Sequence, residues 1–316
     1  MFAETRCILN DHMVRKSAKQ KSAFRAWLTD VLKANGYNVN IESGGSLIKS
    51  NNVVVGHPET AQVVFSAHYD TCAVLPFPNL ITPRNLFFYI LYQILILIPM
   101  LVLAVGAEIL LLALWSEAPM WLAMLVVYFV LGFCFWWMMA GPANKNTAND
   151  NTSGVATLME IALSLPEEER KNVAFIFFDN EEKGLLGSSL YKKMHGKEIK
   201  NTLLINFDCV SDGNYIQFYP NKTVKNNQFI LNSLQNAFSA YGEKTVEIVK
   251  SFCLYPSDQA AFPNGIGVAA MHKSRLGFWL GRIHTNRDTV FDEENIKLLC
   301  HGALVLPSIL GAAKDK

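Results

Sequence analysis

VAFIFFDNEE, residues 173–182, decides the fold of this chain. Val173–Phe178 is entirely apolar, which is typical of a strand that is covered on both faces in the centre of a sheet. The sequence turns acidic directly afterwards, at Asp179-Asn180-Glu181-Glu182. Functional residues in such folds gather just past the carboxyl ends of the central strands. This stretch therefore predicts a buried sheet with a site at its edge.

Strand-like and helix-like segments alternate outside residues 84–142. Such alternation predicts an α/β fold, a three-layer α/β/α sandwich around a mixed, mostly parallel central sheet. We expect further strands at Tyr37–Ile41, Asn52–Gly56, Gln62–Ala67, Leu203–Phe207, Tyr215–Phe218, Val246–Val249 and Gly265–Ala270. We expect helices at Lys19–Asn35, Ser153–Leu165, Asn226–Tyr241 and Glu293–Leu310.

Two long uncharged apolar runs interrupt this pattern. Leu86–Ala107 and Pro119–Ala140 each supply the ~20 residues that a membrane-spanning helix needs, and Ile109–Trp115 extends the first. We expect a transmembrane helical hairpin. A hydrophobic lid or a dimerisation arm in a soluble protein is the alternative. The expected organisation is a discontinuous α/β domain at 1–83 and 143–316, with the hairpin inserted at 84–142.

The flanks of the hairpin predict its orientation. Arg84 and Lys145 bracket it, whereas the turn between the runs carries Glu108 and Glu117. Cytoplasmic flanks carry an excess of Lys and Arg, so we expect an integral membrane protein of the cell membrane whose main domain faces the cytoplasm. Residues 1–30 contain no apolar core of signal-peptide length, which agrees with this orientation.

Composition excludes several classes of protein. The net charge of +1 provides no strong field for nucleic acid. The six cysteines are scattered without a CxxC pair, which argues against a disulfide framework and a zinc ribbon and suits a reducing compartment. The basic stretch Arg15–Arg25 is interpreted as a solvated helix face. Surface or structural positions are expected for His12, His57, His195, His272 and His301.

Acidic and histidine side chains follow several of the expected strands. Together they would repel one another strongly, with no matching cluster of Lys or Arg, and divalent cations would relieve that repulsion. Imidazole with carboxylate is typical of zinc, and a shared carboxylate can hold two metals about 3.5–4 Å apart. The residues concerned are His68, Asp70, Asp150, Asp179, Glu181, Glu182, Asp208 and His284.

Nearly the whole chain outside the apolar insert resembles the M28 family of zinc peptidases, the co-catalytic aminopeptidase group. The resemblance rests on six motifs in family order: FSAHYDT (65–71), ANDNTSGVATLMEIA (148–162), FIFFDNEEKGLLGS (175–188), INFDCVSDG (205–213), SDQAAF (257–262) and IHTNRDT (283–289). It implies two Zn²⁺ ions bridged by Asp150. The implied remaining ligands are His68 and Asp208 for the first ion, and Glu182 and His284 for the second.

The resemblance also implies roles for neighbouring residues. Glu181 is implied as the general base that activates a metal-bound water. Asp70 would orient His68 through the far ring nitrogen, and Asp288 would support the His284 loop. The peptide bond Asp150-Asn151 is expected to be cis.

Two departures from the family pattern concern substrate choice. The family's Ser-Asp-His is here Ser257-Asp258-Gln259, and an oxyanion-stabilising tyrosine has only an approximate counterpart in Tyr255. The resemblance therefore predicts metal binding more directly than substrate preference.

The function predicted is that of a membrane-anchored dizinc aminopeptidase that acts on peptides or N-terminal amines beside a lipid bilayer. A glutaminyl-cyclase-like enzyme with one zinc is the first alternative, and the presence of both His68 and Asp208 favours two metals over one. A catalytically silent membrane scaffold or receptor is the second alternative. Neither the natural substrate nor the oligomeric state follows from the sequence.

Overall fold

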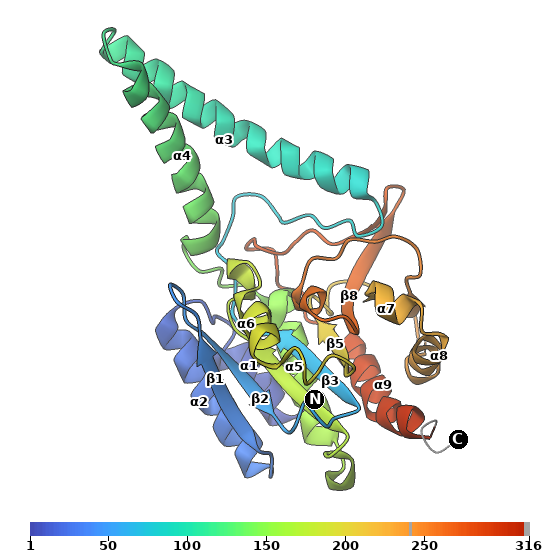
Figure 1. Cartoon of the computed structure of the whole chain (residues 1–316). Helices are drawn as coiled ribbons and strands as arrows, with labels where there is room; N and C mark the ends of the chain where they lie inside the picture. The colour runs from blue at the N-terminus through green and yellow to red at the C-terminus, as the bar shows by residue number, and fades with distance from the viewer. Residues whose placement is uncertain (240–241, 313–316) are drawn as a thin grey trace.

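A nine-stranded mixed sheet forms the centre of the molecule in the computed structural model, which describes residues 1–239 and 242–312. The strand order is β1-β2-β4-β3-β5-β8-β6-β7, with β9 paired to β8 (Figure 1). The central pairs β4–β3, β3–β5 and β5–β8 are parallel, whereas β1–β2, β2–β4 and β6–β8 are antiparallel. The strands are β1 (Val39–Gly44), β2 (Ser50–Val55), β3 (Val63–His68), β4 (Val173–Phe178), β5 (Leu203–Phe207), β6 (Tyr215–Pro220), β7 (Thr245–Ile248), β8 (Gly265–Ser274) and β9 (Gly277–Trp279).

The central strands confirm the sequence prediction. Every residue of β3, β4 and β5 is buried, and all six residues of VAFIFF lie in β4. The sheet is covered on both faces, which explains why these strands are apolar throughout instead of alternating. His68 pairs in register with Phe178, so β3 and β4 end at the same edge of the sheet.

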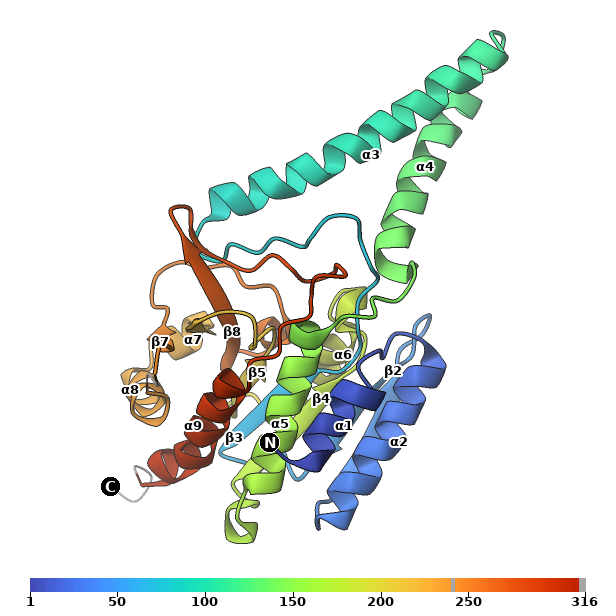
Figure 2. The ribbon, with the colours of Figure 1, turned by 180° about the vertical axis from the view of Figure 1, so that it is seen from behind.

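Helices cover both faces of the sheet and give the expected three layers. Figure 2 shows α1, α2, α5 and α9 on one face, and Figure 1 shows α6 on the other. Phe24 and Leu28 of α2 pack into the larger core, whereas Tyr191 of α6 packs with Phe178 and Phe262 on the opposite face. The helices are α1 (Ala3–Asp11), α2 (Ala18–Ala34), α5 (Gly154–Ser164), α6 (Leu186–His195), α7 (Lys222–Lys225), α8 (Gln228–Ala237) and α9 (Glu293–Gly311).

The predicted helix over 226–241 is present but shorter. It is α8 (Gln228–Ala237), which begins after the N-cap Asn227, whose side chain accepts from the Ile230 amide, whereas α7 precedes the predicted range. Residues 240–241 lie outside the described part of the chain. The helices α1 and α6 were absent from the sequence prediction.

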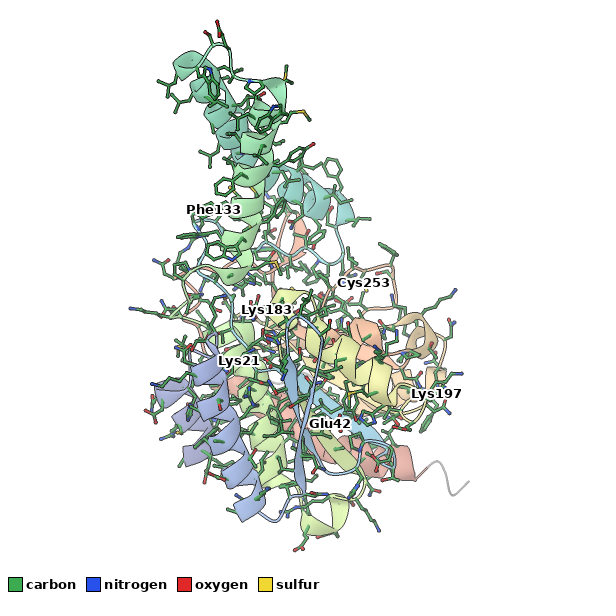
Figure 3. All side chains as sticks on the ribbon, turned by 60° about the vertical axis from the view of Figure 1, so that its left-hand side comes forward. Lys21, Glu42, Phe133, Lys183, Lys197 and Cys253 are labelled. Carbon is green, nitrogen blue, oxygen red and sulfur yellow. The ribbon has the colours of Figure 1, made fainter. Side chains whose placement is uncertain are left out.

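The apolar insert forms two long helices, α3 (Leu86–Leu114) and α4 (Met120–Ala140), which project from the body as a hairpin (Figures 1 and 2). Both are long and apolar enough to cross a membrane. Many of their large apolar side chains are exposed, and Figure 3 shows them, Phe133 among them, radiating outward above the body. The first helix runs through Glu108 without a break, so Ile109–Trp115 extends it as expected.

The chain just after β3 lies beside the chain that leaves α4. Ala73 and Ala143 form an antiparallel bridge, and the Val74 amide donates to the Pro142 carbonyl at 2.8 Å. β3 precedes the insert and β4 follows it, yet the two strands are neighbours in one sheet. From the bridge at Ala73, the segment before α3 crosses the body to the β8–β9 turn, where Asn85 donates to the Leu276 carbonyl, so the bases of α3 and α4 lie apart (Figures 1 and 2).

Candidate metal centre

The predicted ligands come from five separate segments that meet at the carboxyl edge of the parallel strands. His68 is the last residue of β3, and Asp208 directly follows β5. Glu181 and Glu182 form a 3₁₀ turn after β4, entered through Asn180 in the left-handed conformation (φ 56°). The remaining segments are the turn before α5, with Asp150, and the loop after β9, with His284.

Asp150 is shared between two groups of side chains. Its Oδ1 lies 3.4 Å from His68 Nε2, which lies 3.6 Å from Asp208 Oδ1. Its Oδ2 lies 3.1 Å from His284 Nε2, which lies 3.4 Å from Glu182 Oε2. The two oxygens of one carboxylate thus face two different histidines, as a bridging ligand requires.

These separations fit zinc. Ligands at Zn–N and Zn–O distances of about 2.0–2.2 Å in a tetrahedron lie about 3.4 Å from one another, and the four measured separations span 3.1–3.6 Å. Glu182 Oε1 is buried without a hydrogen-bond partner, which a cation would satisfy. The five side chains fit two zinc ions.

Cys72 is a further donor that the sequence analysis missed. Ligand atoms of Cys72, Asp150, Glu182 and His284 all lie within 4.8 Å of one another. The thiol follows Asp70 by two residues at the same strand end, so its position beside the HYD motif was the signal available in the sequence.

Burial and neighbouring charges shift the pKa values of the side chains at the site. Burial raises the pKa of Glu182 to about 8, and burial together with neighbouring carboxylates raises that of Glu181 well above its ordinary value. Burial lowers the pKa of His284, but Glu182 and Asp150 outweigh it and raise that pKa to about 9. Burial raises the pKa of the Asp150 carboxyl, but the nearby His284 and His68 lower it by more and hold it far below its usual range. Divalent cations would relieve this crowding.

Asp70 contacts the site differently from the prediction. His68 Nδ1 lies 3.0 Å from the backbone carbonyl of Asp70, whereas the Asp70 carboxylate is 3.6 Å away. That carboxylate instead accepts from the amides of Glu181 (2.9 Å) and Glu182 (3.2 Å). The backbone of Asp70 thus contacts the histidine, while its side chain fixes the turn that carries both glutamates.

Asp288 supports Asp150. Its two carboxylate oxygens accept from the amides of Asn149 (2.8 Å) and Asp150 (3.0 Å). The peptide bond between Asp150 and Asn151 is cis, as expected.

The interpretation of the basic stretch Arg15–Arg25 as a solvated helix face is wrong at two positions, Arg15 and Lys21. Arg15 is fully buried: its Nε donates to the Tyr69 carbonyl and its Nη1 to Thr152 Oγ1 at 3.2 Å. Lys21 is 6% exposed and donates to Asp179 Oδ1 (2.5 Å) and to Asn180 (2.7 Å). Two cations that the sequence analysis left at the surface therefore support the segments around the site.

The residues that depart from the family pattern are also buried. The Tyr255 hydroxyl donates to the Asp208 carbonyl at 2.9 Å, and the ring stacks on Tyr219. Both carboxylate oxygens of Asp258 are buried without a partner, and burial raises the pKa of this group to about 7. Asp258 and Tyr255 thus lie beneath the site rather than at the surface.

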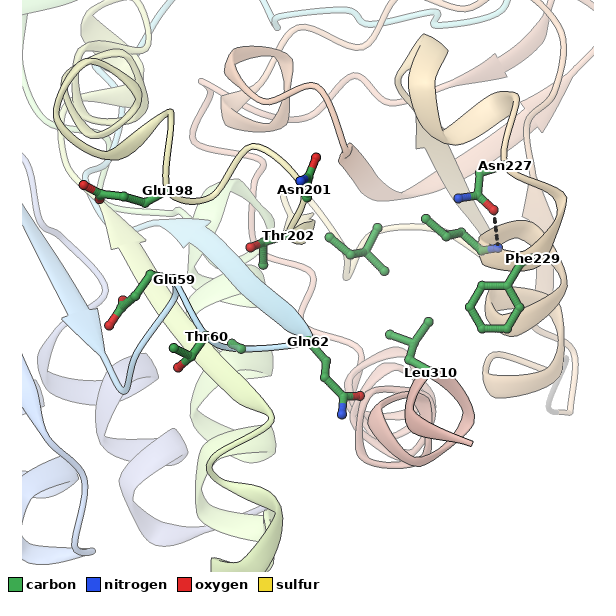
Figure 4. A pocket seen from close by; sticks show the side chains of 12 residues that line it. Glu59, Thr60, Gln62, Glu198, Asn201, Thr202, Asn227, Phe229 and Leu310 are labelled. Carbon is green, nitrogen blue, oxygen red and sulfur yellow. Dashed lines mark hydrogen bonds between the residues drawn. The ribbon is translucent and has the colours of Figure 1, made fainter. Parts of the chain in front are cut away.

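A cavity of about 170 Å³ opens over the ligands. Asn79 and Ile81 from the segment before α3, together with Ile283, line it beside the metal-ligating side chains. A larger cavity, about 610 Å³, lies elsewhere, between the segment before β3 and the starts of β5 and α8, and its lining includes Glu59, Glu198 and Phe229 (Figure 4). No histidine or cysteine lines that cavity, so the smaller one is the candidate active site.

Comparison with known proteins shows the family of this chain. The model of "Peptidase family M28" matches residues 134–307, more than half of the chain. The chain belongs to peptidase family M28. A comparison of the sequence with curated proteins finds no match.

Solved structures share the fold of this M28 chain. It is similar to Porphyromonas gingivalis glutaminyl cyclase (TM-score 0.57, 16% identity, 96% of this chain and 94% of that one). It is also similar to the Legionella pneumophila LapA aminopeptidase (TM-score 0.55, 15% identity, 97% of this chain and 68% of that one). A third similar structure is a Zn-dependent exopeptidase from Parabacteroides distasonis (TM-score 0.56, 17% identity, 97% of this chain and 96% of that one). At these identities the similarity shows the fold alone, and the neighbours' names include both peptidases and a cyclase.

Proposed function

We propose that this M28 chain is a membrane-anchored dizinc aminopeptidase whose catalytic domain faces the cytoplasm. The observation that carries the proposal is Asp150, whose two oxygens face two separate histidine–carboxylate groups. Glu181 adjoins Glu182 in the same turn and lines the cavity above the ligands. This arrangement supports hydrolysis of a peptide bond placed over two metals.

His68, Asp150 and Asp208 would hold one ion, and Asp150, Glu182 and His284 the other. When bound, zinc supplies a nucleophile at neutral pH and a Lewis acid for the scissile carbonyl. Glu181 takes the proton of the attacking water and passes it to the leaving amine. Asp70 holds Glu181 in place through the backbone amide of that residue.

The size of the cavity supports removal of a single residue. At about 170 Å³ it is close to the ~150 Å³ cavity that takes one benzene molecule. It therefore accommodates about one side chain, whereas an endopeptidase must hold an extended chain on both sides of the cut. The substrate's free amine would lie against the acidic ligands.

Contacts at the base of the hairpin support the membrane anchor. Arg84 lies one residue before the N-cap of α3, and Lys16 Nζ donates to the Met139 carbonyl in the last turn of α4 at 2.7 Å. Cations at both helix bases suit an anionic cytoplasmic surface.

Replacing Glu181 with Gln tests the mechanism. We expect loss of most turnover on unblocked peptides, with two zinc ions per chain retained, because Gln cannot accept the proton and Glu181 is not among the proposed ligands. Membrane anchoring has its own test, which is resistance of the full-length protein to alkaline extraction from membranes. An active Glu181→Gln enzyme would refute the role of Glu181.

A glutaminyl-cyclase-like reaction is the second candidate, and Asp258 is the observation that favours it. Both of its carboxylate oxygens are buried without a hydrogen-bond partner, and burial raises its pKa to about 7, so a substantial share of this group is protonated near neutral pH. Such an acid is suited to protonating a leaving ammonia. Pyroglutamate formation from glutaminyl peptides with one tightly bound zinc would favour the cyclase. Amino-acid release with two zinc ions would favour the peptidase.

A further inference from the structure

An apolar cavity of about 410 Å³ lies at the base of the hairpin, away from the metal ligands. One side is formed by the first turns of α3, through Phe88, Leu91 and Leu95, and the other by Leu276 and Trp279 around the β8–β9 turn. This volume is in the range of ligand-binding pockets.

Asn85 fixes the shape of this cavity. As the N-cap of α3, it accepts from the Phe88 amide at 3.3 Å. Its Nδ2 donates to the Leu276 carbonyl at 3.0 Å. One side chain thus joins the start of the helix to the tip of the β8–β9 turn, so the cavity is built by hydrogen bonds and not by loose packing.

Basic side chains lie beside the apolar lining. Lys273 and Arg275 flank Ser274 in the turn, and both are exposed. Neither forms an ion pair within the part of the chain that the structure describes. Lys273 Nζ lies over the rings of Tyr215 (5.6 Å) and Phe278 (5.5 Å). Leu276, which follows Arg275 and lines the cavity, is 55% exposed.

We propose that this cavity binds one acyl chain of an anionic phospholipid, with the lipid phosphate at Lys273 and Arg275. The inference rests on the membrane anchoring proposed above. α3 supplies one wall and continues outward with exposed apolar side chains, so the hydrocarbon that would surround the helix is continuous with the cavity. The cationic rim selects an amphiphile with a negative headgroup over a purely apolar peptide.

The cavity shares a wall with the candidate active site. Leu80 lines the apolar cavity, and its neighbour Ile81 lines the 170 Å³ cavity over the metal ligands. Ile81 and Leu280 exchange two backbone hydrogen bonds of 3.0 Å, and the Leu75 amide donates to the His284 carbonyl at 2.7 Å. A bound acyl chain would therefore pack against the strand-like wall that leads to His284.

Lipid retention by the full-length protein tests this proposal. The protein is purified in mild detergent after incubation with phosphatidylglycerol or phosphatidylcholine of equal chain length, and bound lipid is counted by native mass spectrometry. We expect about one retained phosphatidylglycerol per chain. Leu91→Trp, which fills the cavity, should lower retention at least tenfold. Leu101→Trp is the matched control on the same helix, outside the lining, and should retain lipid.

Substitutions in the exposed turn avoid any folding defect in the helix. Leu276→Asp should also abolish retention, and Lys273→Ala or Arg275→Ala should each lower the preference for phosphatidylglycerol about fivefold, the factor that one cation near an anionic surface contributes. Equal losses in Leu91→Trp and Leu101→Trp, no retained lipid in the wild type, or no headgroup preference would overturn the proposal. A wild type that resists alkaline extraction yet retains no lipid would refute the lipid site and leave the anchor standing.

Discussion

The buried ion pair between Lys21 and Asp179 yields a quantitative prediction. The Lys21 side chain is 8% exposed and that of Asp179 is fully buried, with 2.5 Å between Nζ and Oδ1. Lys21→Met removes the charge while keeping much of the apolar stem. Removing one partner of a buried pair costs about 3–5 kcal/mol because the other charge is left uncompensated. Asp179 Oδ2 still accepts from the Asn51 amide at 2.9 Å, so we expect the lower end, about 3 kcal/mol.

Thermal unfolding in detergent, followed by circular dichroism, measures this loss. For a domain of 150–250 residues, about 2–4 °C of Tm corresponds to 1 kcal/mol, so the expected fall is about 6–12 °C. Lys19→Met on the same helix is the control. Lys19 is exposed, and its loss should change the free energy of unfolding by no more than about 0.5 kcal/mol.

The double variant Lys21→Met/Asp179→Asn separates the ion pair from general packing. With both charges gone, no uncompensated carboxylate remains, and most of the lost stability should return. Equal Tm values for Lys21→Met and Lys19→Met would refute the reasoning. Failure of the double variant to recover would show that the loss comes from packing of α2 instead.

Three further predictions concern the metal centre and the insert. Zinc binding to the metal-free protein should release protons and weaken as pH falls below about 9, because His284 and Glu182, with pKa values of about 9 and about 8, must lose protons before they bind metal. Calorimetry in buffers of different ionisation enthalpy measures this, and a pH-independent affinity would contradict it. Asp288→Ala leaves the Asn149 and Asp150 amides without their acceptor and should lower zinc affinity about 10–100-fold in chelator competition; an unchanged affinity would remove Asp288 from the support of Asp150. Replacing residues 84–142 with a short Gly/Ser loop should release the protein from membranes and change its substrate selectivity; unchanged selectivity would count against a substrate presented at the bilayer.

The buried sheet and the gathering of site residues could be predicted because both depend on local patterns. Six apolar residues in a row allow few structures other than a central strand, and parallel strands bring their carboxyl ends to one edge. His68 and Glu182 were therefore predictable as neighbours although 114 positions separate their numbers. The hairpin was predictable for a similar reason, since its length and composition are visible within one window.

The burial of Arg15 and Lys21 could not be predicted, because their partners are distant in sequence. Lys21 lies on a helix that also carries the exposed Lys19 and Lys33, and only the docking of α2 against the turn after β4 encloses it. Arg15 is enclosed because it joins the Tyr69 and Thr152 segments, which lie on opposite sides of the insert. A charge in a helix predicts exposure until the tertiary structure supplies a carboxylate or a carbonyl.

The insert is joined to the body through chain segments that border the metal cavity. Asn79 and Ile81 line that cavity just before α3 begins, and Ala143 pairs with Ala73 just after α4 ends. The chain segments that enter and leave the hairpin are thus part of the wall and rim of the candidate active site. If α3 and α4 cross the bilayer, the opening of the cavity must lie at the membrane surface, because no long linker separates the two. Substrates would then reach the metals from the headgroup layer, where an N-terminal amine of a membrane-bound peptide is available.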